Sequence, residues 1–277
     1  MIRSLYSAVS GLRNHQIRMD VIANNVANVN TTGFKSSRAN FQDVLSQTLR
    51  AAGDAGDAFG ATNPAQVGLG MSLAGISMNF AQGALQNTGR TLDVAIQGNG
   101  FFIIKKSTDE EMHYVTREGV FFIDNAGYLV NSNGYFVCKE DGDVIQVASD
   151  PATIESIAIT DTGKIIVNGS EVATIGLAFF PNPEGLEKVG QNLYRATPAS
   201  GGYDPYAGVS SENINIAGTA DTPLANTRLA SGYLEMSNVD LSEEFTNMIT
   251  TQRGYQANAR VITVSDTLLE ELVNLKR

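Results

Sequence analysis

Near its beginning, the chain places apolar side chains every seven residues and again three residues after each of these. This spacing puts them on one narrow stripe of an α-helix, a pattern typical of helices that pack against other helices. A run of asparagine, threonine and glycine then ends the pattern, so we predict a helix from about residue 2 to residue 28. Such a helix is about 40 Å long. The stripe consists of Leu5, Ala8, Leu12, His15, Met19, Ile22, Val26 and Val29.

A second stripe of the same kind lies near the end of the chain. Asp240 followed by Glu243 resembles a capping box at its start, so we predict a helix from about residue 241 to residue 275. It is about 50 Å long. Helices of this length with a narrow stripe indicate a coiled coil or a helical assembly. The stripe consists of Leu241, Phe245, Met248, Tyr255, Ala259, Ile262, Leu269 and Val273, with Gln252 and Asp266 as polar members.

Between the two helices, the apolar pattern changes to that of β-strands. Short runs rich in Val, Ile, Phe and Tyr are separated by turn signals such as Asn133-Gly134 and Asn168-Gly169, which favour antiparallel hairpins. We therefore predict an antiparallel β-rich domain over residues 96–217. The runs are residues 101–104, 120–123, 135–137, 144–145, 165–167 and 175–179.

The predicted fold class is α+β, with two long terminal helices forming a coiled-coil layer and an inserted antiparallel β-rich domain. Two glycine-rich stretches, residues 51–75 and 198–223, have the composition of extended or flexible connectors. Because the domain's strands are contiguous, we expect its two ends to lie close together and bring the helices side by side. The predicted segments are an N-terminal helix at 1–35, an extended connector at 36–95, the β-rich domain at 96–217, a return connector at 218–239 and a C-terminal helix at 240–277.

The charge of the chain argues against a nucleic-acid partner, because the net charge of its 277 residues is -10. Residues 1–50 carry six basic and two acidic side chains, whereas residues 232–277 carry four basic and seven acidic ones. The two ends are therefore weakly complementary, which favours their meeting. With no run of about 18 apolar residues and no apolar signal segment at the start, we expect neither a transmembrane helix nor a cleaved signal peptide.

Residues that carry catalytic or metal chemistry are scarce and dispersed. The two histidines, His15 and His113, lie far apart, and no nucleophile, metal-ligand or nucleotide-binding spacing accompanies them. We therefore predict no catalytic residues, no cofactor and no metal. The single cysteine, Cys138, lies in an apolar run and is interpreted as a small buried side chain. The acidic run at residues 109–111 is interpreted as a solvated hairpin tip.

His15 is the polar member of the first stripe. It is interpreted as a tolerated polar position that helps to set the register of the helix packing. The alternative is a sensor of pH, since histidine changes its charge near neutral pH.

Seven segments, in order along the chain, closely resemble the signatures of the bacterial flagellar rod and hook protein family. The most specific is Ala23 to Lys35, which contains the motif residues Asn24, Asn25, Asn28, Thr32, Gly33 and Phe34. Together the matches cover both ends and most of the middle. The other segments are residues 4–12, 91–102, 119–134, 190–194, 232–240 and 251–258.

The resemblance implies a structural subunit that polymerises into a hollow helical tube around an export channel. The implied partners are copies of itself, neighbouring rod and hook proteins and the flagellar export apparatus, and the implied location is the basal body, reached by type III export. Within the family, length and the opening residues are most similar to distal-rod subunits, with a short hook or proximal-rod subunit as the alternative. The expected interface residues are Leu5, Leu12, Met19, Ile22, Val26, Leu241, Phe245, Met248, Tyr255, Ile262 and Leu269.

Two functions of other classes remain as alternatives. A coiled-coil-anchored surface adhesin would use the β domain as a ligand-binding head and would form a closed dimer or trimer. An enzyme with an inserted β domain would need a polar constellation that the sequence does not present. We further hypothesise that both terminal segments are largely disordered in the free monomer and fold on assembly, because an isolated helix with one apolar stripe has nothing to pack on.

Overall fold

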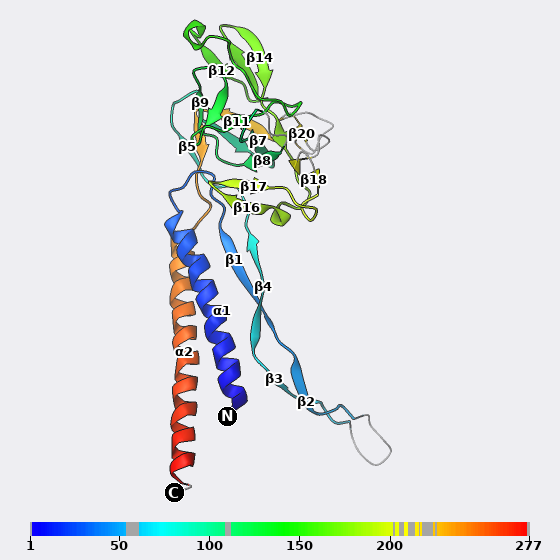
Figure 1. Ribbon diagram of the computed structural model, residues 1–277, viewed down its shortest axis with the longest axis vertical. Coiled ribbons are helices and arrows are strands. Elements are labelled where there is room, and N and C mark those ends of the chain that lie inside the picture. The colour runs from blue at the N-terminus through cyan, green and yellow to red at the C-terminus, as the bar shows by residue number, and fades with distance from the viewer. Residues whose placement is uncertain are drawn as a thin grey trace. The chain divides into compact units, whose positions relative to one another are not determined.

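The computed structural model describes residues 2–53, 61–108, 112–201, 203–204, 208–209, 214–215, 217, 224 and 226–275. Within them, helix α1 spans Ile2–Ala27 and helix α2 spans Leu241–Asn274, and the residues between form β-strands (Figure 1). The predicted α+β class and both predicted helices are therefore confirmed. Asp240 is the N-cap of α2, since its side chain accepts hydrogen bonds from the backbone N–H groups of Ser242 and Glu243.

The chain divides into two compact units, and each unit is formed by segments that are separated in the sequence. Unit 1 consists of Met1–Ala27, Ser37–Met78 and Asp240–Arg277, and unit 2 consists of Asn28–Ser36 and Asn79–Val239. Unit 1 therefore holds both helices, and unit 2 holds most of the strands.

Unit 1 combines the helix pair with a long two-stranded ribbon. β1 (Ser37–Asp43) pairs with β4 (Met71–Met78), and β2 (Ser46–Arg50) pairs with β3 (Ala65–Gly68), both antiparallel. A bridge between Gly53 and Thr62 continues the ladder. Within the predicted connector at 36–95, residues 37–53 thus contain strands that pair with strands in residues 62–78. Residues 54–60, also predicted as connector, lie outside the described residues.

Side chains of α1 fasten the ribbon to the helix. Asn14 donates its Nδ2 to the carbonyl of Met71 (2.7 Å), and the Met71 N–H donates to the Ser10 hydroxyl (3.3 Å). On the neighbouring strand, the Phe41 ring meets His15 edge-on with centroids 6.2 Å apart. These contacts fix the start of β4 against the N-terminal half of α1.

The largest described sheet of unit 2 has nine antiparallel strands in the order β16-β17-β8-β7-β11-β10-β9, with β15 pairing β7 and β20 pairing β15. The predicted antiparallel β domain is thereby confirmed. Its strands are β7 (Phe101–Lys105), β8 (His113–Thr116), β9 (Phe121–Ile123), β10 (Leu129–Asn131), β11 (Phe136–Val137), β15 (Leu177–Ala178), β16 (Glu187–Gly190), β17 (Leu193–Arg195) and β20 (Ile214–Asn215).

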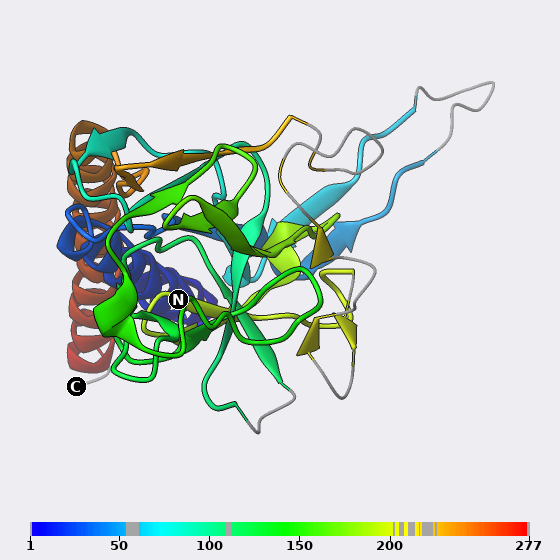
Figure 2. The same cartoon turned by 90° about the horizontal axis from the view of Figure 1, so that it is seen from above.

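Smaller ladders surround this sheet. β12 (Ile157–Ile159), β13 (Lys164–Val167) and β14 (Ser170–Thr174) form a three-stranded sheet, and β18 (Tyr203–Asp204) pairs with β19 (Gly208–Val209). Single 3-10 turns occur at Pro151–Thr153 and Pro183–Gly185. Seen from above, β12 to β14 lie on the main β body of unit 2 (Figure 2).

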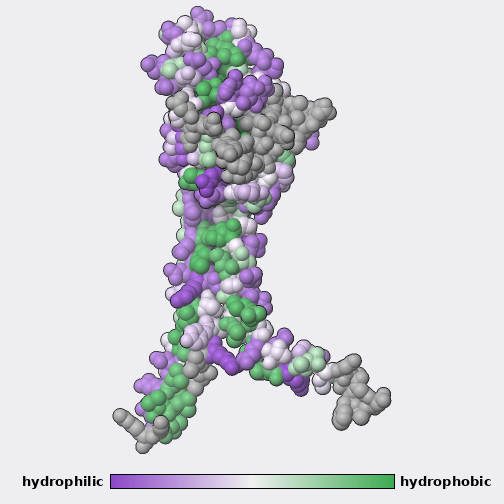
Figure 3. Space-filling view, turned by 45° about the vertical axis from the view of Figure 1, so that its right-hand side comes forward, coloured by the Kyte–Doolittle hydropathy of each residue, from purple (hydrophilic) through white to green (hydrophobic). Residues whose placement is uncertain are grey.

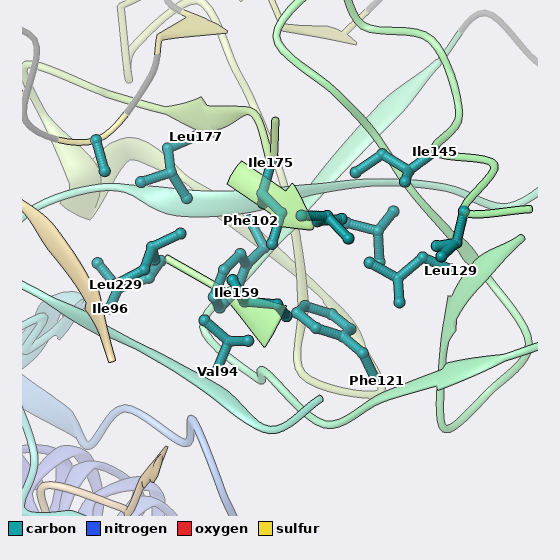
Figure 4. Close-up of a cluster of buried hydrophobic side chains, with 14 of the residues drawn as sticks. Val94, Ile96, Phe102, Phe121, Leu129, Ile145, Ile159, Ile175, Leu177 and Leu229 are labelled. Carbon is teal, nitrogen blue, oxygen red and sulfur yellow. The ribbon is translucent and has the colours of Figure 1, made fainter. Parts of the chain in front are cut away.

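The hydrophobic core of unit 2 lies between these sheets. Side chains from strands far apart in the sequence converge there, among them Val94, Phe102, Phe121, Leu177 and Leu229 (Figure 4). The rings of Phe102 and Phe121 meet edge to face with centroids 5.1 Å apart. Such convergence buries the alternating apolar residues that marked these segments as strands.

The predicted turns occur where expected, and glycine provides the backbone conformation that they need. Gly127 and Gly134 have φ of 77° and 79°, and Asn168 and Gly169 both have positive φ between β13 and β14, as a type I′ hairpin requires. Cys138 is fully buried, as predicted, and burial raises the pKa of its thiol to about 12. The acidic run at 109–111 lies outside the described residues.

The two ends of the β domain lie side by side, as expected, because entering and leaving strands pair. β5 (Leu85–Asn87) pairs with β22 (Tyr233–Glu235), and β6 (Val94–Gln97) pairs with β21 (Arg228–Ser231). Unit 2 consequently extends beyond the predicted limits of 96 and 217, since parts of both predicted connectors supply strands.

A buried carboxylate on β22 holds unit 2 together where its remote segments meet. Glu235 accepts a 2.6 Å bond from Lys35 Nζ and a 2.9 Å bond from the Gly83 N–H at Oε1. At Oε2 it accepts a 3.2 Å bond from the Arg117 guanidinium. All three charged side chains are nearly inaccessible to solvent.

The two cations of this cluster are also bonded to backbone carbonyls. Lys35 Nζ donates to the Ala81 carbonyl (2.8 Å), and Arg117 donates from Nη2 to the Gly98 carbonyl (2.9 Å). Burial lowers the pKa of Lys35, while the negative charge of Glu235 acts in the opposite direction. One carboxylate therefore links four segments that are dispersed along the sequence.

Replacing Glu235 with glutamine should strongly destabilise unit 2. The variant leaves two buried cations without their counter-ion, which costs about 3–5 kcal/mol. Urea unfolding followed by tyrosine fluorescence measures the loss.

Glu187→Gln is the matched control, since Glu187 forms an exposed ion pair with Arg195 that is worth about 0–1 kcal/mol. Equal destabilisation by the two variants would contradict the role assigned to the buried cluster.

Candidate assembly surface

The two helices run antiparallel along one another (Figure 1 and Figure 2). Near the end of α1, Asn25 donates its Nδ2 to Glu244 Oε1 near the start of α2 (2.8 Å). Seven residues earlier on α1 and three residues later on α2, Arg18 donates to Asn247 Oδ1 (3.2 Å). The expectation that the helices lie side by side is confirmed.

Small and polar residues lie at the closest approaches between α1 and α2. A Cβ atom on Gly11 would lie 2.7 Å from Asn258 Nδ2, and one on Gly254 would lie 2.8 Å from His15 Cε1. Both distances are too short for real contacts, so at these two points a side chain of one helix packs directly on a glycine of the other. Thr251 is buried in the same face and donates its hydroxyl to the Asn247 carbonyl (2.6 Å).

The large apolar side chains of α2 consequently remain at the surface. Phe245 is 49% exposed, Ile249 52% and Leu275 82%. Figure 3 shows apolar patches along unit 1, including the far end of α2. We call the large apolar side chains that the two helices expose the outer apolar surface of the helices. It comprises Tyr6 and Val9 on α1 and Leu241, Phe245, Ile249, Tyr255, Val261, Val264, Leu268, Leu272, Val273 and Leu275 on α2.

The predicted interface residues fall into three groups by burial. Ile22 is buried. Leu5, Leu12, Met19 and Val26 on α1 and Met248, Ile262 and Leu269 on α2 are half-buried. Leu241, Phe245 and Tyr255 are exposed. Within this chain, the α1 stripe is thus buried or half-buried, whereas part of the α2 stripe is exposed to solvent. The role of these residues in contacts between subunits stays a prediction.

The ribbon and the residues that flank it expose a second set of apolar side chains, which the sequence pattern assigns to a connector. Leu45 is 80% exposed and Leu49 63% exposed, and Val67 and Leu69 are also exposed. Gln47 lies opposite Val67, and Leu49 lies at a register shift between Thr48 and Arg50. In the sequence, the apolar residues at 45, 49, 67 and 69 indicate this surface, but the many glycine and alanine residues around them are typical of a connector. An isolated two-stranded ribbon is only marginally stable in water.

Asn25 is the motif residue that fixes the chain as it leaves α1. Its Oδ1 accepts the Ser37 N–H (3.0 Å), and its Nδ2 donates to the Ser37 carbonyl (2.8 Å). It thereby ties the end of α1 to the start of β1. Asn28 accepts a bond from the Thr31 hydroxyl in the following turn (3.1 Å), while Asn24 is exposed.

The remaining motif residues lie in unit 2 and have structural roles there. Gly33 has φ of 68°, and a Cβ on it would lie 2.7 Å from the backbone nitrogen of Glu118, so only glycine fits. The Thr32 carbonyl accepts a bond from Asn192 (3.2 Å). Phe34 is buried beneath the Lys188 ammonium, which lies 4.2 Å from the ring centroid.

Neither described helix is long and apolar enough to cross a membrane. Among the described residues, no group of three or more His, Cys, Asp and Glu side chains lies close enough to hold a metal ion.

Comparisons with known proteins agree with the architecture. Family models described as "Flagella basal body rod protein", "Flagellar hook protein FlgE/F/G D1 domain" and "Flagellar basal body rod FlgEFG protein C-terminal" match residues 5–35, 95–167 and 230–275. The flagellar basal-body rod protein FlgG of Bacillus subtilis (strain 168) is 45% identical over 282 aligned residues, covering 100% of both chains. The chain belongs to the flagellar rod and hook protein family.

Other members of the family show its range. FlgG of Borreliella burgdorferi is 38% identical, and the flagellar hook protein FlgE of the same organism is 30% identical over 457 aligned residues, each covering 100% of both chains. The resemblance to the rod and hook family is therefore confirmed, and the chain is a structural subunit of the flagellar axis.

Replacing Gly254 with valine should weaken any assembly that needs the helix pair. The new side chain has no room beside His15, and such overpacking costs about 1–3 kcal/mol. The critical concentration for assembly should therefore rise about tenfold or more. Pelleting assays over a range of protein concentrations measure this value.

Gln256→Val is the matched control, because Gln256 is exposed on the same helix two residues away. The interpretation fails if Gly254→Val assembles as readily as this control.

The assembled protein should lose stability as the pH falls toward 5.5. Burial lowers the pKa of His15, and the charge of Arg18 adds to the effect. With a folded pKa below the unfolded value of about 6.5, the unfolded chain binds more protons in the window between them, so stability decreases as pH falls through it. Critical concentrations at about pH 7.5 and pH 5.5 measure the change.

His15→Gln should show a smaller rise over the same interval. Glu244, whose pKa is raised by burial, acts in the opposite sense but is present in both proteins, so the comparison isolates His15. Identical pH profiles would exclude His15 as the cause.

Proposed function

We propose that this chain is a subunit of the distal rod of the flagellum, which assembles head to tail with copies of itself into a torque-transmitting tube that encloses the export channel. Its relatives named FlgG support this assignment, since they match it over their full length at 36–45% identity. A second candidate within the family is a short hook or proximal-rod subunit, which the match to hook proteins favours.

The outer apolar surface is the observation that carries the proposal. Soluble monomers rarely leave so many large apolar side chains exposed along one element, and α2 together with its C-cap Leu275 exposes ten of them. Covering these residues requires other subunits, because they remain exposed although α1 already packs against α2. Contacts between different surfaces of successive copies do not close on themselves and yield filaments.

We propose a non-catalytic role, with copies of this chain and neighbouring rod and hook proteins as partners. We further propose that the chain reaches the basal body unfolded, through the flagellar type III export apparatus and without a cleaved signal. The exposed apolar side chains of α2 support this, because helices that gain much of their packing on assembly can travel as an extended chain.

Phe245→Ser should raise the critical concentration for assembly about tenfold. Phe245 is about half exposed in the monomer. Burying that exposed half against a neighbouring subunit contributes about 1.5 kcal/mol to assembly. Electron microscopy of the polymers and pelleting assays provide the measurement.

Gln252→Ser is the control, since Gln252 is exposed and polar on the same helix. The proposal would be contradicted by wild-type protein that forms no open polymer, or by a Phe245→Ser variant that polymerises like the control.

Complementation distinguishes the two candidates within the family. The gene should restore motility to a Bacillus subtilis strain that lacks FlgG, and not to a strain that lacks its hook protein. The reverse result would favour the hook candidate.

A further inference from the structure

One face of α2 continues past the end of the partner helix. The residues that face α1 are spaced alternately by three and four, through Asn247, Thr251, Gly254 and Asn258. The same alternation reaches Val261, Ser265, Leu268, Leu272 and Leu275. This is the heptad spacing of a helix that pairs with another helix along its whole length.

The register of the pair shows where α1 ends along this face. Gly11 lies opposite Asn258, and His15 lies opposite Gly254. Nine residues before Gly11 is Ile2, the first residue of α1, and nine residues after Asn258 is Thr267. The leucines at 268, 272 and 275 therefore extend beyond α1, over about 10 Å of helix.

These three leucines form an exposed ridge. Their exposed fractions are 45%, 50% and 82%. The face becomes wholly apolar at the same place, since it includes Asn247, Thr251, Gly254, Asn258 and Ser265 as well as Val261 where α1 covers it. We call Leu268, Leu272 and Leu275 the leucine ridge.

A groove of suitable character lies elsewhere in unit 1, between α1 and β4. Its volume is about 510 Å³, and its lining includes Tyr6, Val9, Ile17 and Leu73. The polar groups at its floor are already used, because Asn14 and Ser10 bond the backbone of Met71. Apolar walls are thus left for an occupant, in a cleft of the size that binds compact apolar groups.

Charges around the ridge and the groove are opposite. α1 carries Arg3, Arg13 and Arg18 against one acidic residue, and Arg13 lines the groove. The described part of α2 that carries the ridge has Asp266, Glu270 and Glu271 and no basic residue after Arg260, and Lys276 and Arg277 follow Leu275 in the sequence. Such complementarity orients one copy on another.

We propose that the leucine ridge of one subunit docks into the groove between α1 and β4 of the next subunit. The proposal rests on the proposed function and specifies which two surfaces meet. The ridge lies beyond the level of Ile2, whereas the groove lies beside residues 6–17, so a straight α2 cannot fill the groove of its own chain. The mode is a helix laid into an apolar groove, and ridge and groove together form a head-to-tail contact that does not close.

Crosslinking within the polymer tests the contact directly. Two full-length variants, Val9→Cys and Leu272→Cys, are mixed, allowed to polymerise and treated with a short thiol-reactive crosslinker. The native Cys138 is fully buried and stays unreacted. A crosslinked pair containing one copy of each variant is expected, and Val273→Cys in place of Leu272→Cys should give several-fold less, because Val273 is exposed but lies off the ridge.

Assembly measurements supply a second readout. Leu272→Ser should raise the critical concentration at least tenfold, and Val273→Ser should change it little. The double variant Leu272→Ser with Val9→Ser should raise it by less than the product of the two single fold-changes. Both α2 positions lie beyond α1, so circular dichroism of the polymers should be unchanged.

The outcomes separate this inference from the proposed function. Polymers that form normally but give no Val9–Leu272 crosslink, or equal crosslinking at 273, overturn the docking and leave polymerisation standing. Wild-type protein that forms no polymer overturns the proposed function and the docking with it.

Discussion

The close antiparallel contact between α1 and α2 determines how the rest of unit 1 meets its surroundings. Gly11 against Asn258 and Gly254 against His15 leave no room for larger groups at these positions. Many large apolar residues of α2 remain exposed beside this contact. A pair built in this way gains little from its own interface and much from neighbours, which is the property that a polymerising subunit requires.

Unit 2 has the opposite organisation. Its apolar strands converge on a closed core, and the Glu235 carboxylate binds two buried cations and a backbone N–H from distant segments. The family motif contributes to both units, because Asn25 secures the end of α1 in unit 1 while Gly33, Phe34 and Lys35 are buried in unit 2. The family motif at residues 23–35 is thus explained by local backbone geometry and buried contacts.

The sequence predicted the elements well where one local pattern decides them. The helix bounds followed from the heptad stripes and the Asp240 cap, and the hairpin turns followed from Asn-Gly pairs. The face that α2 turns toward α1 was not predictable in the same way, because its glycine and asparagine residues carry no apolar signal. Likewise, Lys35 and Glu235 stand 200 residues apart, and only the folded chain shows that they pair. The ribbon was read as a connector because glycine and alanine mask the alternate leucines at 45, 49 and 69.

The central claim is that the terminal helices obtain their stability from neighbouring subunits. Hydrogen exchange measured by mass spectrometry, on dilute monomer and on polymer of the same protein, tests it most directly. The account predicts that residues 2–27 and 241–274 exchange rapidly in the monomer and slowly in the polymer, while the strands between residues 94 and 195 are protected in both. Helices that are already fully protected in the dilute monomer would contradict it.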